Sequence, residues 1–423
     1  MGAPLSTLEA LEESLAAHEK DLSHALEKMQ DITMHDALII LRYSLGATKL
    51  LHTLRCCPCG GHPGLARYDE VLRSGLCRIL NLSLTDEAWL QATLPIKLGG
   101  LGIRSVSQLA LPAFLASAAG TDQLQSAMLG NMASPDVRWE TARTSWLGIS
   151  SAQCPETGLS HRQSAWDRPL LDRVITDLQT RLTDPKQRAR LGVTAATHAG
   201  DWLLALPIAN CGLRLDDEAV RVAVGLRLGT PLCEPHKCPC GAPVAADGLH
   251  GLSCALGPGR LPRHASLNDL IYRGLIRAGF PSAKEPAGLM RSDGRRPDGL
   301  TLVPWRVGRC LVWDATVTDT NAASYLSDTS QTVGAAAERA AARKHEKYLP
   351  LSATHFFVPL AFETMGPINT EGHGFLSDLG RKLSTITGDP RETSFLYQRI
   401  SLTIQRFNAI AFRGTFASQD NDE

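Results

Sequence analysis

Two acidic residues stand beside apolar, strand-forming runs in the stretch 284–348, and they constrain the fold of this 423-residue chain more than any other feature. Asp298 lies in the turn-forming string Arg-Arg-Pro-Asp-Gly, just before the apolar run 300–303. Asp314 directly follows the apolar run 310–313. An acid at a strand end that faces an acid on a neighbouring turn is a common way to hold a hard divalent cation. We therefore expect two neighbouring strands that carry a Mg²⁺ site.

Apolar periodicity extends this prediction on both sides of the two acids. The C-terminal part alternates strand-like runs with amphipathic segments, which indicates a mixed α/β domain with a central sheet. We expect strands over 300–303, 309–317 and 355–362, and helices over 265–278, 332–348, 375–384 and 393–412. The part before residue 225 is mostly helical in spacing, with helices over 36–54, 68–82, 167–192 and 216–228. The sequence as a whole predicts an α+β fold with an N-terminal helical region.

Composition limits the function classes. Lys+Arg and Asp+Glu are balanced at 43 each, which argues against a protein that coats nucleic acid along its whole length. Residues 260–347 nevertheless carry 14 basic against 9 acidic side chains, a local excess that would suit a polyanion near Asp298. No apolar run approaches the roughly 20 residues of a transmembrane helix, and the N-terminus lacks a signal-peptide pattern. We expect an intracellular protein with no membrane partner.

A Cys/His cluster precedes the strand-rich part. Cys238 and Cys240 stand on a Gly-terminated turn, and His250 and Cys254 follow four residues apart. Three thiolates and one imidazole are the donor set of a tetrahedral structural zinc site. Because Cys-x-Cys is tighter than the common Cys-x-x-Cys, one ligand could instead come from nearby residues, namely Cys233, His236 or His264. The alternative interpretation is a loop whose thiols bind nothing.

Two other patterns suggest sites less strongly. The Cys-x-x-Cys-x-x-His spacing over 56–62 could cradle a metal, but no fourth ligand is nearby, and a Pro/Gly loop is the alternative. The glycine-rich string 94–104 lacks both the Gly-Lys-Ser/Thr of a phosphate loop and the Gly-x-Gly-x-x-Gly of a dinucleotide fold. We expect it to be a tight turn packed against helices.

Parts of the N-terminal region resemble a polymerase-associated segment. LRYSLGATKLLHTLR (41–55), the helix at Tyr68-Asp69-Glu70 and LPIKLGGLGIRS (94–105) resemble the thumb-side segment of reverse transcriptases from non-LTR retrotransposons. In that family the segment is helical, follows the catalytic palm and packs against the template-primer duplex. The resemblance implies that the palm lies upstream of residue 1, so we expect no polymerase activity from this chain.

The motif order in the C-terminal half carries a more specific resemblance. A Cys-Cys-His-Cys cluster, an Arg-Pro-Asp turn, an acid after an apolar strand and Lys-x-x-Lys-Tyr on a helix follow one another. This order resembles the C-terminal region of retrotransposon polyproteins with a restriction-like endonuclease of the PD-(D/E)xK type. The two resemblances cover nearly the whole chain. They imply a nuclease that nicks target DNA and so provides the primer for reverse transcription.

The resemblance assigns roles to four residues of this sequence. Asp298 and Asp314 would ligate one or two Mg²⁺ ions, and Lys344 or Lys347 would stabilise the nucleophile or the developing charge on phosphorus. In the simplest form of this nuclease pattern a lysine stands two residues after the second acid, where this chain has Thr316. In the endonucleases that this chain resembles, the lysine lies on the downstream helix, which here offers Lys344 and Lys347 one turn apart.

Three further residues near the acids are weaker candidates. Glu285 would be a supporting carboxylate, and Arg295 and Arg296 would hold neighbouring phosphates of the DNA. For Asp298 the structural alternative is an ordinary turn residue in a Pro-Asp-Gly sequence. The combination of both acids, the downstream lysines and the upstream cluster favours a site.

The expected organisation has four parts, and two function classes stay open. We expect a helical thumb-like region (1–120), a helical connector (121–232), the zinc cluster (233–264) and a restriction-endonuclease-like domain (265–423). The first class is a Mg²⁺-dependent DNA endonuclease in the nucleus, with DNA and element RNA as partners. The second is a catalytically inactive nucleic-acid-binding remnant of a retrotransposon polyprotein.

Overall fold

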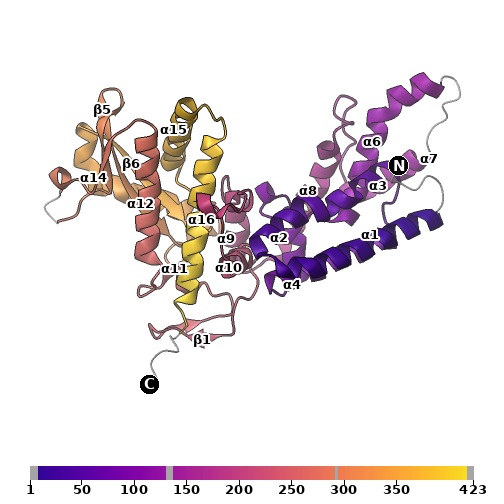
Figure 1. Ribbon diagram of the computed structural model, residues 1–423, viewed down its shortest axis with the longest axis horizontal. Helices are drawn as coiled ribbons and strands as arrows, with labels where there is room; N and C mark the ends of the chain where they lie inside the picture. Colours follow the sequence, from indigo (N-terminus) through magenta and orange to yellow (C-terminus); the bar gives the residue numbers. More distant parts are fainter. Residues whose placement is uncertain (1–7, 130–136, 291–293, 417–423) are drawn as a thin grey trace. The chain divides into compact units, whose positions relative to one another are not determined.

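The computed structural model describes residues 8–129, 137–290 and 294–416, and the chain divides into two compact units (Figure 1). Unit 1 consists of Met1–Pro95 and Gly100–Leu182, and unit 2 of Ile96–Gly99 and Thr183–Glu423. Unit 1 contains only helices among its described residues, whereas unit 2 contains helices and two sheets. The predicted α+β fold is confirmed. The division into four functional segments stays a prediction.

The helices of unit 1 pack around leucine-rich faces. Long helices supply most of the contacts, with α1 against α4 and α6 against α3 and α8. The elements are α1 (Leu8–Lys28), η1 (Met29–Asp31), α2 (Met34–Ile40), η2 (Leu41–Leu45), α3 (Ala47–Cys56), α4 (Pro63–Leu80), α5 (Asp86–Ala92), α6 (Val106–Leu129), α7 (Val137–Ser150) and α8 (Gln163–Arg181).

Two sequence predictions concern the helix expected over 36–54 and the glycine-rich string 94–104. The single helix expected over 36–54 is divided, because a π-helical turn at Leu41–Leu45 separates α2 from α3. The glycine-rich string forms a tight turn, as expected: the Gly102 amide donates to the Leu94 carbonyl oxygen over 2.9 Å. A Cβ atom on Gly100 would lie 2.0 Å from that same oxygen, so only glycine fits there.

Unit 2 is built on a mixed sheet in the strand order β3-β4-β5-β6. The strands are β3 (Ser282–Lys284), β4 (Gly299–Arg306), β5 (Arg309–Thr318) and β6 (Phe356–Glu363). Neighbouring strands are antiparallel except β5 and β6, which are parallel. Helix α14 (Ala335–Tyr348) lies in the connection between these two parallel strands, as such a crossover requires.

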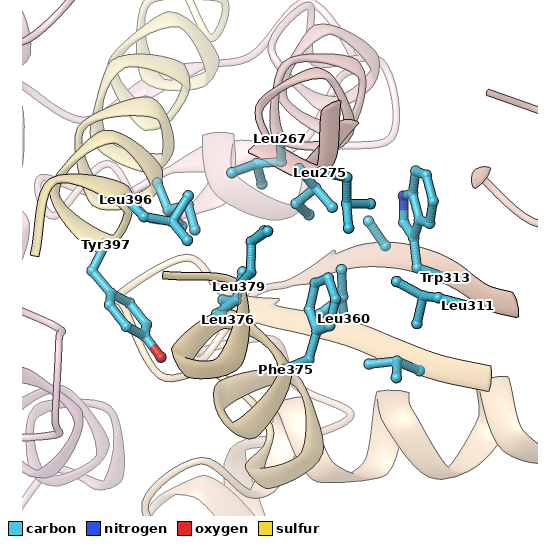
Figure 2. Packing of buried hydrophobic residues seen from close by; sticks show 14 of the residues in the cluster. Leu267, Leu275, Leu311, Trp313, Leu360, Phe375, Leu376, Leu379, Leu396 and Tyr397 are labelled. Atoms are coloured by element: carbon cyan, nitrogen blue, oxygen red, sulfur yellow. The ribbon is translucent and has the colours of Figure 1, made fainter. Parts of the chain in front are cut away.

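The two faces of this sheet are covered by different helices. Side chains alternate along a strand, so Leu311, Trp313 and Ala315 share one face and Val312 and Asp314 the other. The first face packs against α12 (Arg260–Arg277), α15 (Thr370–Thr387) and α16 (Glu392–Arg413) in the main core of unit 2 (Figure 2). The second face packs against α14, which lies beside β6 in Figure 1. Asp314 therefore points to the side of the sheet that α14 covers.

The remaining elements of unit 2 lie before and between these parts. They are η3 (Ile96–Leu98), α9 (Pro185–Thr194), η5 (Asp201–Leu203), η6 (Ala209–Cys211), α10 (Asp217–Leu228), β1 (His236–Lys237), β2 (Pro243–Val244), α11 (His250–Ser253), η7 (Ala287–Leu289), α13 (Leu326–Thr329) and η8 (Leu349–Ala353). The helix expected over 167–192 is interrupted after Arg181, before Asp184 caps α9. None of the helices in the described parts of the chain is long and apolar enough to cross a membrane.

Candidate functional site

The register between β4 and β5 brings Asp298 and Asp314 to neighbouring positions. Gly299 is paired with Trp313 in this antiparallel ladder, so the residues beside them, Asp298 and Asp314, lie opposite each other. Glycine is required at 299, because a Cβ atom there would lie 1.9 Å from the indole ring of Trp313. The Asp-Gly pair therefore lets the turn that carries Asp298 lie close against β5.

Asp298 is held by two donors on one carboxylate oxygen. Its Oδ2 accepts the backbone N–H of Ala315 over 2.6 Å and a hydrogen bond from His264 Nε2 over 3.0 Å. Its backbone oxygen accepts from the Glu285 amide at 3.0 Å and from Asn268 Nδ2 at 3.3 Å. The side chain is only 13% exposed. Asp298 is thus more constrained than an ordinary turn residue.

Asp314 lies in the middle of β5 and is almost completely buried, with 3% of its surface exposed. Its Oδ2 forms an ion pair with the Lys344 ammonium group, and the Tyr348 hydroxyl lies 3.3 Å from its Oδ1. Burial raises the pKa of Asp314, the Lys344 charge opposes this rise, and the nearby charge of Asp298 adds to it. A second positive charge at this position would favour the ionised carboxylate further.

The two candidate lysines on α14 have different surroundings. Lys344 contacts Asp314 directly and is 23% exposed. Lys347 donates to the Tyr348 hydroxyl over 2.7 Å and lies above that ring. The charges of both lysines lower the pKa of Asp314, and the charge of Lys344 lowers it more. The structure thus places the two predicted acids and a predicted lysine in one cluster, although Lys344 lies 30 positions after Asp314 in the chain.

The weaker candidates surround this cluster. Glu285 lies beside Asp298 through its backbone, but its carboxylate is largely exposed and pairs with the Arg296 guanidinium group. The Arg296 carbonyl oxygen accepts from the Tyr348 hydroxyl at 2.9 Å, which ties the arginine turn to α14. Arg295 is exposed beside it. Glu285 and Arg296 therefore pair with each other at the edge of the cluster.

The sequence does not predict that His264 belongs to the acidic cluster. The sequence predicts His264 only as a possible zinc ligand, whereas in the structure its Nε2 contacts Asp298 Oδ2. The hydrogen bond to that carboxylate raises the pKa of His264, and burial opposes the rise. No sequence spacing signals this contact, because His264 and Asp298 are 34 positions apart and meet only through the packing of α12 on the sheet.

The predicted zinc ligands converge in a second cluster. The ligand atoms of Cys238, Cys240, His250 and Cys254 all lie within 4.8 Å of one another. Cys238 Sγ and Cys254 Sγ are 3.9 Å apart, and Cys240 Sγ is 3.2 Å from His250 Nε2. Ligands about 2.0 to 2.3 Å from a tetrahedral zinc ion would be separated by roughly 3.5 to 3.8 Å. The donor set and its spacing therefore fit zinc.

Short local elements assemble this cluster. A β1–β2 hairpin carries Cys238 and Cys240 at its turn, and α11 carries His250 with Cys254 at its C-terminal end. Hydrogen bonds from the Ala242 amide, first, and from the side chains of Cys238, His250 and Cys254 lower the pKa of the Cys240 thiol to about 7, and burial opposes this. Burial raises the pKa of the Cys238 thiol. A bound cation would offset that cost, because thiolates are the metal-binding form.

The alternative ligands for this cluster are engaged elsewhere. Cys233 Sγ lies 3.6 Å from the Ala245 carbonyl oxygen, and His236 Nε2 lies 3.0 Å from Thr415 Oγ1. His264 contacts Asp298 instead. The tight Cys-x-Cys spacing therefore needs no substitute ligand.

The Cys/His spacing over 56–62 does not form a comparable cluster among the described residues. Cys57 and Cys59 are buried, and burial raises the pKa of Cys59 to about 12. His62 Nδ1 instead accepts the Gly64 amide over 3.2 Å at the start of α4. This geometry favours the structural alternative of a Pro/Gly loop.

Comparison with known proteins gives a distant similarity. No protein-family model matches the chain. The chain is similar to the retrotransposable element SLACS 132 kDa protein of Trypanosoma brucei gambiense, with 27% identity over 232 residues. The matched part is 55% of this chain and 16% of that protein. This similarity supports a retrotransposon-related origin.

Proposed function

We propose, from this retrotransposon-related origin, that the chain is a Mg²⁺-dependent endonuclease that nicks DNA and uses a structural zinc ion. The single observation that carries the proposal is the cluster of Asp298, Asp314 and Lys344. Three separate elements contribute these side chains, namely the turn before β4, strand β5 and helix α14. Burial of an acid beside a second acid and a lysine costs stability. Such clusters are often retained because they are functional sites.

The residues have the chemistry that phosphodiester hydrolysis needs. Mg²⁺ held by Asp298 and Asp314 would polarise the scissile phosphate and lower the pKa of an attacking water molecule. Lys344 places a positive charge beside the Asp314 carboxylate, where it would stabilise negative charge that develops on the phosphate. Tyr348 fixes the second acid and the arginine turn relative to each other. Lys347 supports this arrangement through the Tyr348 hydroxyl.

The surroundings of the cluster favour a polyanionic substrate. Arg295 and Arg296 lie on the exposed turn just before Asp298, where they would contact phosphates on either side of the cleaved bond. The local excess of basic residues over 260–347 has the same sign. The similar trypanosome protein is named as a retrotransposable-element protein, and the motif order of this chain resembles endonucleases that nick target DNA. DNA is therefore the proposed substrate, and the nucleus the proposed compartment.

Relaxation of supercoiled plasmid tests this function. We expect the purified protein to nick the plasmid with Mg²⁺ or Mn²⁺, and Asp298→Ala to abolish nicking. Lys344→Ala should slow nicking by about 10²- to 10³-fold, because a preorganised charge is lost. Lys347→Ala should have a smaller effect, since Lys347 acts through Tyr348. Asp328→Ala is the matched control, because Asp328 is an exposed acid that pairs with Arg339.

Two other outcomes would redirect the assignment. Equal nicking by wild type and Asp298→Ala would show that the activity comes from another site or a contaminant. Binding of DNA without nicking by the wild-type protein would instead favour the catalytically inactive nucleic-acid-binding remnant. A gel-shift measurement with the same plasmid fragments separates that outcome from a protein with no affinity for DNA.

A further inference from the structure

The carboxylate of Asp298 is oriented by a side chain from outside the sheet. His264 lies in the second turn of α12 and donates through Nε2 to Asp298 Oδ2 over 3.0 Å. The same oxygen accepts the Ala315 N–H, so both described donors to this carboxylate reach Oδ2. The other oxygen, Oδ1, takes part in neither of these two contacts. A cation bound at Oδ1 would leave both of these contacts intact.

Helix α12 binds both the backbone and the side chain of Asp298. Asn268, one turn after His264, donates to the Asp298 carbonyl oxygen at 3.3 Å and accepts from the Trp313 indole at 2.8 Å. Arg263, next to His264, is buried and donates to Asn408 of α16 at 3.0 Å. The position of His264 is therefore fixed by buried contacts on both sides of it. A histidine held in this way can fix the orientation of the carboxylate that it contacts.

We propose that His264 is a positioning residue that orients Asp298 for cation binding, an inference that rests on the proposed function. Groups that hydrogen-bond to a metal-ligating carboxylate orient it, and their removal typically weakens metal binding about 10- to 100-fold. His264 occupies this place relative to Asp298. It is assigned no contact with DNA or with the reacting atoms.

A plain ion pair is the competing explanation, and the chain offers a matched control for it. His345 pairs with Glu371 and has an exposed fraction of 44%, against 40% for His264. If His264 formed only a surface pair of this kind, its loss would have little effect, as is typical of exposed pairs. Comparison of the two histidines therefore separates positioning from general electrostatics.

Calorimetric titration of the zinc-loaded protein with Mn²⁺ is the first test. We expect His264→Ala to weaken Mn²⁺ binding by about 10- to 100-fold. His264→Gln should retain most of the affinity, because a glutamine amide can place an N–H donor near the position of Nε2. His345→Ala should bind as the wild type does. Equal affinity of His264→Ala and wild type would overturn the inference.

Crystal structures of the wild type and His264→Ala without Mg²⁺ or Mn²⁺ keep this inference separate from the nuclease assignment. We expect the Asp298 carboxylate to rotate away from its wild-type orientation in His264→Ala and to keep it in His264→Gln. If the wild type does not nick DNA but this rotation occurs, the proposed function fails and the positioning role stands. An unchanged Asp298 orientation in His264→Ala would overturn the positioning role whether or not the protein nicks DNA.

Discussion

The zinc cluster and the acidic cluster of unit 2 are assembled in opposite ways. The four soft ligands of the zinc cluster come from a 17-residue stretch, 238–254, through one hairpin and one short helix. The acidic cluster combines His264, Asp298, Asp314 and Lys344, which are spread over about 80 residues and four elements. The first cluster depends on local chain geometry, and the second on packing of the whole sheet.

The two clusters also differ in their ligands. Protein atoms fill all four positions of the zinc cluster, which is the pattern of a structural site. The acidic cluster offers few, hard oxygen ligands beside a lysine, so a cation held there would keep coordination positions for substrate and water. We infer that the first cluster contributes mainly to folding and the second mainly to activity.

Disruption of the zinc cluster should have the largest effect on stability. Cys238→Ser removes a buried ligand, and structural zinc contributes directly to the free energy of folding. We expect unit 2 to lose on the order of several kcal/mol, which corresponds to a fall of roughly 10 °C or more in its melting temperature. Thermal unfolding followed by circular dichroism, together with zinc analysis, measures both quantities.

Cys233→Ser is the matched control for this experiment. Cys233 Sγ lies near the backbone carbonyl oxygens of Ala245 and Ala246 and is not one of the four converging ligands, so the variant should keep about one zinc per chain. A wild-type protein that contains no zinc and melts as Cys238→Ser does would contradict a structural zinc site.

Glu363 should show a smaller effect that depends on pH. This fully buried carboxylate at the end of β6 accepts the Ala337 amide at 3.1 Å and the Thr320 hydroxyl at 2.8 Å. It thereby fixes the first turn of α14, the helix that carries Lys344. Burial raises the pKa of Glu363 above its ordinary value of 4.5, and its hydrogen bonds oppose the rise.

The sign of the pH effect follows from this raised pKa. The folded state binds the Glu363 proton more tightly than the unfolded state, so this stabilising contribution is full below about pH 4.5 and is lost as pH rises through the folded pKa. Glu363→Gln imitates the neutral form. The stability of the wild type should therefore fall relative to the variant with rising pH, by about 1.4 kcal/mol per unit of pKa elevation.

Urea unfolding of both proteins from pH 4 to pH 8 measures this difference. The zinc cluster should respond in the opposite direction, because its ligands bind metal after losing their protons. A constant stability difference between wild type and Glu363→Gln across this range would show that Glu363 titrates alike in both states.

Much of the fold could be predicted because apolar spacing is a local signal. The expected strand 309–317 corresponds to β5 (Arg309–Thr318), and the expected helix 332–348 to α14 (Ala335–Tyr348). Strand β3 was not expected, because Ser282–Lys284 is short and carries no apolar alternation. It forms because its backbone pairs with β4, which is a tertiary effect.

The candidate sites likewise differ in how far local spacing predicts them. All four zinc ligands could be chosen from spacing, since the hairpin and α11 place them locally. The choice between Lys344 and Lys347, and the contact of His264 with Asp298, could not be made from spacing. Both depend on how α12 and α14 lie on opposite faces of the sheet, and one helical turn or one face decides which side chain reaches an acid.

The smallest effect is expected from the second Cys/His spacing, in unit 1. Cys56 is exposed, whereas Cys59 is buried, and a buried thiol with a pKa of about 12 at Cys59 remains protonated at neutral pH. We expect Cys59→Ala to leave the zinc content at about one per chain and to cost unit 1 about 1 kcal/mol or less, since little volume is removed. His62→Ala should likewise leave the zinc content unchanged, although it removes the acceptor for the Gly64 amide. A wild-type content of two zinc ions that falls to one in either variant would show that the spacing over 56–62 binds metal after all, and that local spacing alone decides both sites.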